Sequence, residues 1–213
     1  MRYVAGCRMT CDPMNRNVVA LAGVLLSAYA IVPAARSQRE SLRPAIDNER
    51  VTVWDLSAGN SPAPASTRPC VSIRATTQVD VSFFPKCAAE AWRTGPAGSV
   101  VIELKDHPVP PLANASGFPN AFPRPGVTKR LENDKVLVWD YTWTTGVPTP
   151  MHFHDKDVVV VYLENGALKS TTPDRQSVVN ELSRGLIRFN ARDRIHTEEL
   201  VKGKSRAIIT ELK

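Results

Sequence analysis

Short runs of β-branched and aromatic residues, bounded by Gly, Pro, Asn or Asp, fill the C-terminal part of this 213-residue chain. After residue 132 they read KVLVWDYTW, DVVVVYL, ALKSTTP, SVVNEL, GLIRFN and RAIITEL. Such runs predict β-strands, and their close spacing predicts a sandwich or a barrel. Beyond the N-terminal segment, helical periodicity is weak apart from KCAAEAW at 86–92. The sequence therefore predicts an all-β fold.

Two stretches of the chain repeat each other's strand signatures. NERVTVWD at 48–55 aligns with NDKVLVWD at 133–140, an offset of 85 residues. SVVIELK at 99–105 aligns with AIITELK at 207–213, an offset of 108 residues. Strand signatures that open and close two stretches in the same way predict two related units. We expect the first unit at 38–105 and the second at 133–213.

The stretch 106–132 between these units has six prolines in 27 residues. Proline lacks an amide donor and has a fixed φ, so this stretch is predicted to be neither helix nor central strand. It is either a linker or a segment that wraps around a unit. His107, near its start, has no neighbour at metal-ligand spacing and is interpreted as an exposed loop residue.

The N-terminal segment 1–37 has the pattern of an export signal. Arg16 precedes a run of fifteen mostly apolar residues at 18–32, with small residues around its end. A positive flank, a short apolar run and small residues characterise signal peptides, and fifteen residues are few for a membrane span. We expect cleavage between Ala30 and Ser37 and a periplasmic or secreted bacterial protein. A membrane anchor and a buried helix are the alternatives.

Charge and cysteine content agree with that compartment. The formal charge of +6 falls to +3 without residues 1–37, because that segment carries four arginines and one acidic residue. A small, evenly spread excess gives no indication of nucleic-acid binding. Cys70 and Cys87 then remain as a pair. They either form a disulfide that stabilises the fold by about 3 kcal/mol, or stay as two buried thiols.

Two of the four histidines lie two residues apart, directly before a valine run. They are His152 and His154, and the valines occupy 158–161. Alternate residues of a strand point to the same side, so these two imidazoles are expected to lie together. A third imidazole or a carboxylate from a neighbouring strand would complete a facial ligand set, and His196 is the candidate. The alternative is surface or core histidines without a metal.

The second unit resembles a cupin at two motifs. The first cupin motif runs Gly, five residues, His-x-His, and closes on a further Gly. Here Gly146 is followed by five residues and then His152 and His154, and Gly166 closes the motif at the expected distance.

The second cupin motif runs Gly, five residues, Pro, one residue, Gly, two residues, His, three residues, Asn. From Gly185 this spacing reaches His196. Ala191 stands where Pro is usual, Asp193 where the second Gly is usual, and Leu200 where Asn is usual. The distance from Gly185 to His196 thus matches the second motif, whereas the Pro, Gly and Asn positions of that motif do not.

The resemblance implies a cupin-type double-stranded β-helix, or jelly-roll barrel, with two cupin-like units. The first unit would be degenerate, because no histidine lies between residues 48 and 105. The resemblance also implies a divalent metal ion, Fe, Mn, Ni or Zn, bound in the second unit. Its expected ligands are His152, His154 and His196.

The glutamate of the first cupin motif is missing from this chain. Val158 or Val159 occupies its place, and the nearest carboxylate is Asp157. Strict alternation puts Asp157 on the opposite face from His154, so only a local bulge would turn it inward. We rank it as a second-tier metal ligand, and a site of three histidines plus water is the alternative. Weaker substitutes are Asp155, Glu198 and Glu199.

Cupins carry out oxygenation, isomerisation, decarboxylation and hydrolysis, and some only bind sugars or sense ligands, so the resemblance does not name a reaction. It implies a metal-binding cupin acting on a small organic metabolite. Three arginines near the third histidine are either clamps for a substrate carboxylate or a solvated basic edge. They are Arg188, Arg192 and Arg194.

The alternative is a non-catalytic binding or storage cupin with a structural metal. For partners we expect a small-molecule ligand or substrate, no nucleic acid and no stable membrane insertion after cleavage, and we leave a homodimer open.

Overall fold

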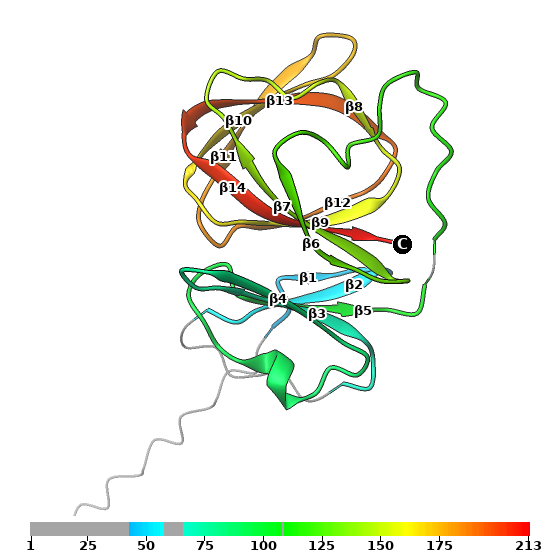
Figure 1. Cartoon of the computed structure of the whole chain (residues 1–213), viewed down its shortest axis with the longest axis vertical. Helices are drawn as coiled ribbons and strands as arrows, with labels where there is room; N and C mark the ends of the chain where they lie inside the picture. Colours follow the sequence, from blue (N-terminus) through cyan, green and yellow to red (C-terminus); the bar gives the residue numbers. More distant parts are fainter. Residues whose placement is uncertain (1–42, 58–65, 108) are drawn as a thin grey trace, which may run out of the picture. The chain divides into compact units, whose positions relative to one another are not determined.

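Two β-sheets facing each other form a barrel in the C-terminal part of the chain (Figure 1). The structure is a computed structural model that describes residues 43–57, 66–107 and 109–213. One sheet has the strand order β12-β9-β14-β7-β6 and the other the order β11-β10-β13-β8. The strands are β6 (Val127–Glu132), β7 (Val136–Trp143), β8 (His152–His154), β9 (Asp157–Tyr162), β10 (Gly166–Thr171), β11 (Ser177–Leu182), β12 (Ile187–Asn190), β13 (Arg194–Gly203) and β14 (Ser205–Leu212).

A third sheet precedes the barrel in sequence and has the order β1-β2-β5-β3-β4. Its strands are β1 (Ile46–Asp47), β2 (Val51–Asp55), β3 (Cys70–Ala75), β4 (Val79–Phe84) and β5 (Val100–Leu104). The predicted helical stretch is the short 3₁₀-helix η1 (Ala89–Trp92) between β4 and β5. The all-β prediction is confirmed, and the barrel is the predicted jelly roll.

The first sheet repeats the topology of the barrel's five-stranded sheet. Numbered in chain order, the strands of both sheets are arranged 1-2-5-3-4, with every neighbouring pair antiparallel. The register is also equivalent, because Val51 pairs with Leu104 in the first sheet and Val136 pairs with Leu212 in the barrel. The sequence repeat thus corresponds to two sheets with the same strand order and an equivalent register.

The two related sheets share one hydrophobic core. Valines and isoleucines of β2, β3 and β5 pack against Val136, Val138, Val159, Val161 and Ile208 of the barrel, all of them fully buried. Burial of this kind contributes about 25 cal/mol per Å² of apolar surface. The described residues of the first unit form this one sheet, so its origin as a degenerate cupin barrel stays a prediction.

Strand β9 is buried on both faces, which explains its run of four valines. Val159 and Val161 point into the core shared with the first sheet, whereas Val158 and Val160 point into the barrel. Side chains of a strand alternate between its faces. Asp157 therefore lies on the face that looks toward the first sheet and away from the barrel interior.

The proline-rich stretch packs along the barrel and is hydrogen-bonded to it. Figure 1 shows it as the green segment that leaves β5 and runs along one side of the barrel. Phe153 of β8 donates a hydrogen bond to Pro119 and accepts one from Ala121. Of the two alternatives the sequence left open, the wrapping segment is the one observed. The end of the predicted linker, 127–132, forms the proline-free edge strand β6.

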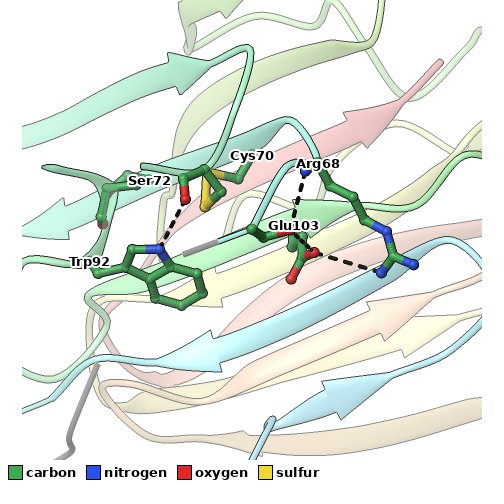
Figure 2. Close-up of a disulfide and its surroundings, with 8 residues drawn as sticks. Arg68, Cys70, Ser72, Trp92 and Glu103 are labelled. Carbon is green, nitrogen blue, oxygen red and sulfur yellow. Dashed lines mark hydrogen bonds and ion pairs between the residues drawn. A yellow bond between two sulfur atoms is a disulfide. The ribbon is translucent and has the colours of Figure 1, made fainter. Parts of the chain in front are cut away.

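Cys70 and Cys87 form a disulfide with a Cα–Cα distance of 5.4 Å. Figure 2 shows the indole of Trp92 beside it, where Nε1 donates a hydrogen bond to the Cys87 carbonyl at 3.3 Å. Nearby, Arg68 Nη1 lies 3.6 Å from Glu103 Oε1. The disulfide links the first residue of β3 to the segment that follows β4, and a buried cluster there contains both cysteines and Trp92.

The predicted leader and its cleavage site lie outside the described residues. The described residues from 43 to 213 form one compact unit. Within the described ranges, no helix is both long and apolar enough to cross a membrane.

Candidate metal centre

The three histidines of the cupin motifs meet inside the barrel. His152 and His154 come from β8, and His196 comes from the adjacent strand β13, where it pairs directly with His152. Their ring centroids are 4.8–5.0 Å apart. The potential ligand atoms all lie within 4.8 Å of one another, and each residue is at most 7% exposed.

The histidine nitrogens are poorly satisfied by protein groups. His152 Nδ1 donates to the Pro150 carbonyl at 2.8 Å, which fixes the tautomer that leaves Nε2 as an acceptor. Both ring nitrogens of His154 and Nε2 of His196 are buried without a hydrogen-bond partner among the described residues. Buried polar atoms are nearly always paired, so these orphan nitrogens fit a bound metal ion.

Burial keeps all three imidazoles neutral at physiological pH. Desolvation is the main cause that lowers the pKa of His152 and of His196 to about 4. Nearby Arg124 lowers both further, and Arg194 acts on His196. The pKa of His154 is also lowered, first by burial and then by Arg194. Neutral imidazole is the form that binds a metal ion.

Backbone geometry explains which motif residues were kept. A Cβ added to Gly166 would lie 2.4 Å from the Lys204 carbonyl oxygen, so only glycine fits there. Asp193, at the position of the usual second glycine, has φ +65°. Aspartate is among the few side chains that tolerate this left-handed conformation. The turn before His196 is therefore retained although its glycine is not.

Arg124 is a site residue that the sequence reasoning missed. The wrapping segment carries it into the pocket lined by His154 and His196. Its guanidinium carbon lies 4.7 Å from the ring centroid of Phe122 and 4.2 Å from that of Tyr141. Such contacts stabilise a desolvated cation. Its Nη1 is 3.4 Å from Nε2 of His152.

Glu198 brings a carboxylate close to the histidines. It lies two residues beyond His196 on the same face of β13, with Oε1 3.9 Å from His196 Nε2. Its Oε2 accepts a hydrogen bond from Trp143 Nε1 at 3.2 Å and lies 3.6 Å from Arg124 Nη2. Of the weaker substitutes for the missing glutamate, this is the one that the structure brings to the site.

Asp157, the second-tier ligand, does not lie with the histidines. Its Oδ2 forms an ion pair with Arg50 Nη1 at 2.7 Å, and its Oδ1 accepts a hydrogen bond from the Arg192 amide at 2.8 Å. No bulge turns the side chain inward, so strict alternation holds. The buried carboxylate has a protein partner in place of a metal.

The remaining acidic candidates are also engaged elsewhere. Asp155 is paired with Lys156 at 2.7 Å, and Glu199 with Lys169. His107 lies outside the cluster, with a side chain 55% exposed and 3.8 Å from Glu49. It is the exposed loop residue that we expected.

The three arginines proposed from the sequence separate in the structure. Arg194 pairs with His154 across the strands and lines the histidine pocket. Arg188 instead donates to Asn180 Oδ1 at 3.0 Å, and the Arg192 side chain donates to the Pro110 carbonyl. Only Arg194 of the three is placed to act at the histidines.

No family model matches this chain, and no curated protein matches it. Solved structures do. The chain is similar to a cupin domain from Bordetella pertussis Tohama I, with 28% identity, 44% of this chain and 99% of that chain covered, and a TM-score of 0.38. It is similar to a polyketide cyclase from Streptomyces resistomycificus, with 18% identity, 47% and 78% of the two chains covered, and a TM-score of 0.35. For an RmlC-like cupin with a double-stranded β-helix fold from Methanocaldococcus jannaschii, the identity is 12%, the coverage 50% and 91%, and the TM-score 0.35.

The fold of this chain and the positions of its motif residues agree with the cupin pattern. The barrel has two facing antiparallel sheets, and the motif histidines lie on neighbouring strands inside it. The closing glycine and the left-handed turn stand where the two motifs require them. Together these features show that residues 127–213 have the fold of a cupin-type double-stranded β-helix, with the motif histidines inside the barrel.

Proposed function

We propose that this protein is an exported cupin that binds a divalent metal ion and acts on a small organic molecule inside the barrel. The observation that carries the proposal is the cluster of three buried histidines, in which both ring nitrogens of His154 and Nε2 of His196 have no hydrogen-bond partner among the described residues. The ligands would be His152, His154 and His196. A metal held by neutral imidazoles keeps its positive charge, so it could polarise a carbonyl or enolate oxygen or activate water or dioxygen.

The residues of the chain prepare this site in three ways. The Pro150 carbonyl holds His152 in one tautomer, so that Nε2 faces the cluster. The aromatic side chains of Trp143 from β7 and Tyr162 from β9 line the pocket. Glu198 can accept a proton or a hydrogen bond from a bound molecule, because one of its oxygens faces His196.

A second candidate function is binding without catalysis, as in a storage or sensing cupin with a structural metal. The size of the pocket favours it, because the volume beside the histidines is about 30 Å³. That is about the volume of one water molecule. A substrate larger than this would need side chains to move.

Export is supported by the disulfide between Cys70 and Cys87, since such bonds persist in oxidising compartments. It agrees with the signal-peptide pattern at 1–37. Intact-mass analysis of the protein recovered from its native host tests the proposal. A mature N-terminus between Ala30 and Ser37 supports export, and a full-length chain in the membrane fraction contradicts it.

The metal proposal is tested by metal analysis of the full chain after reconstitution with Fe(II), Mn(II), Ni(II) or Zn(II). We expect about one ion per chain in the wild type and in His107→Ala, whose histidine is exposed. We expect His196→Ala to lose most of the metal. Wild-type protein that binds no more metal than His196→Ala would overturn the proposal. A screen for dioxygen uptake and for decarboxylation of small acids then separates enzyme from binding protein.

A further inference from the structure

Two arginines line the histidine pocket, and each has a buried donor nitrogen that is left unpaired. Arg124 and Arg194 both line the histidine pocket. The Arg124 side chain is 7% exposed. Its Nε and the Nη2 of Arg194 are buried without a hydrogen-bond partner among the described residues. Desolvating a charged group costs several kcal/mol unless it is paired and hydrogen-bonded. These donors therefore indicate a missing acceptor.

The charge of the pocket also indicates that an anionic acceptor binds there. Glu198 is the only acidic residue that lines it within the described part of the chain. The two guanidinium groups outweigh this carboxylate by one positive charge, and a divalent metal would add two more. A cavity with an excess of positive charge and a low dielectric binds anions more strongly than neutral molecules.

Arg124 is held so that its charge stays in the pocket. Three aromatic rings surround the guanidinium group: those of Phe122, Tyr141 and, at 5.9 Å, Trp143. Glu198 lies 3.6 Å away on one side. Arg194 is fixed from the other direction, because its Nε donates to the Ala191 carbonyl at 2.6 Å. Both side chains are thus fixed before a ligand arrives, which lowers the entropic cost of binding.

We propose, building on the proposed function, that the ligand of this pocket is a small organic carboxylate whose anionic group is held by Arg124 and Arg194 beside the three histidines. The planar guanidinium group of arginine matches the two oxygens of a carboxylate. Because the cavity beside the histidines has a volume of only about 30 Å³, even a small carboxylate requires other side chains of the pocket to move. One of the two anion-binding residues comes from the wrapping segment, so the pocket is complete only when that segment is in place.

The test is calorimetric titration of the full chain with acetate, oxalate and inorganic phosphate, with the neutral oxamide as a matched probe. Each is run on metal-free and metal-loaded protein, and the metal content is measured in the same samples. We expect oxalate or acetate to bind the metal-free wild type, and oxamide and phosphate to bind at least tenfold more weakly. Equal binding of oxamide, or tighter binding of phosphate, would overturn the proposal.

Variants assign the binding to the two arginines. Arg124→Gln and Arg194→Gln should each weaken carboxylate binding about tenfold or more, because each loses a charged donor. Arg188→Gln is the control, since Arg188 does not line the pocket. Unchanged carboxylate binding in both Gln variants would contradict the assignment. Arg124→Lys keeps the charge and shows whether a loss in Arg124→Gln comes from charge or from misfolding, as monitored by thermal unfolding.

The two proposals fail in different ways. Metal-free protein that binds carboxylates through Arg124 and Arg194, but takes up no metal, would refute the metal site and keep the anion site. Protein that takes up metal at the histidines, but binds carboxylate equally in the wild type and in both Gln variants, would refute the anion site alone.

Discussion

Arg50 and Asp157 form a buried ion pair between the first sheet and the barrel, with Arg50 Nη1 2.7 Å from Asp157 Oδ2. Their side chains are 9% and 10% exposed. Arg50 Nη2 also donates to the Lys213 carbonyl at 3.3 Å. The acidic residue that the sequence pattern placed closest to the missing glutamate thus joins two sheets of the fold. Its role can be separated from metal binding by mutation.

Asp157→Asn should lower the free energy of unfolding by about 3 kcal/mol, because it leaves the Arg50 guanidinium buried without its counter-charge. Urea denaturation of the metal-free protein measures this. The double variant Arg50→Met/Asp157→Leu should recover most of the loss, since no unpaired charge remains. Metal content should equal that of the wild type in both variants. A loss of metal as large as in His196→Ala would instead make Asp157 a ligand.

Acid should destabilise the metal-free protein between about pH 6.5 and pH 4. Burial lowers the pKa of His152 and His196 to about 4 in the folded chain, whereas an unfolded histidine has a pKa of about 6.5. Within this window the unfolded chain binds more protons, so stability falls as pH falls. Each histidine contributes up to about 1.4 kcal/mol per pH unit. Chemical denaturation at pH 7.5, 6 and 5 in the presence of a chelator measures the slope.

The variants His196→Gln and His107→Ala test the source of that slope. The first should make it shallower, because one buried imidazole is gone. The second should leave it unchanged, because His107 is exposed. An equal slope in all three proteins would show that other groups cause the acid sensitivity.

Loss of the disulfide should lower the free energy of unfolding by about 3 kcal/mol, as expected for a closed loop of this length. The variant Cys70→Ser/Cys87→Ser and the reduced wild type should agree in stability. Trp92 donates to the Cys87 carbonyl, so its fluorescence should also change on reduction. Denaturation with and without dithiothreitol provides the measurement. A wild type insensitive to reductant would contradict the prediction.

Gly166→Ala should destabilise the protein by about 3 kcal/mol, because the new methyl group would meet two backbone carbonyl oxygens at 2.4 and 2.6 Å. Gly146→Ala is the matched control within the same motif. A Cβ there meets nothing within 4 Å, and only its φ of +71° opposes alanine, which costs about 1 kcal/mol. Thermal unfolding compares the two. A larger loss in Gly146→Ala would contradict the steric argument.

The histidine cluster could be predicted from strand alternation together with the spacing of the two cupin motifs. His152 and His154 share a face by strand alternation, and the motif spacing selected His196 as the third candidate. Arg124 could not be found this way. It lies 28 residues before His152 in a proline-rich stretch, and only the tertiary path of that stretch brings it to the pocket.

Pairings between distant residues were likewise beyond sequence reasoning. The separation of Cys70 and Cys87 depends on how the 16 residues between them fold, so a disulfide and two thiols were equal alternatives. The edge strand β6 was included in the predicted linker. The last proline of that stretch is at residue 125, but the predicted linker extended to residue 132. Parity did foresee that Asp157 faces away from His154, although its partner Arg50, 107 residues away, could not be inferred.

The five-stranded sheet of the barrel is apolar on both sides, and this makes the two halves of the chain interdependent. Val136, Val138, Val159, Val161 and Ile208 would be exposed to water if the first sheet were removed. A fragment beginning at residue 126 would therefore expose an apolar face to water and should aggregate rather than remain a folded monomer. The first sheet, which contains no histidine, thus covers the apolar outer face of the barrel that contains the histidine cluster.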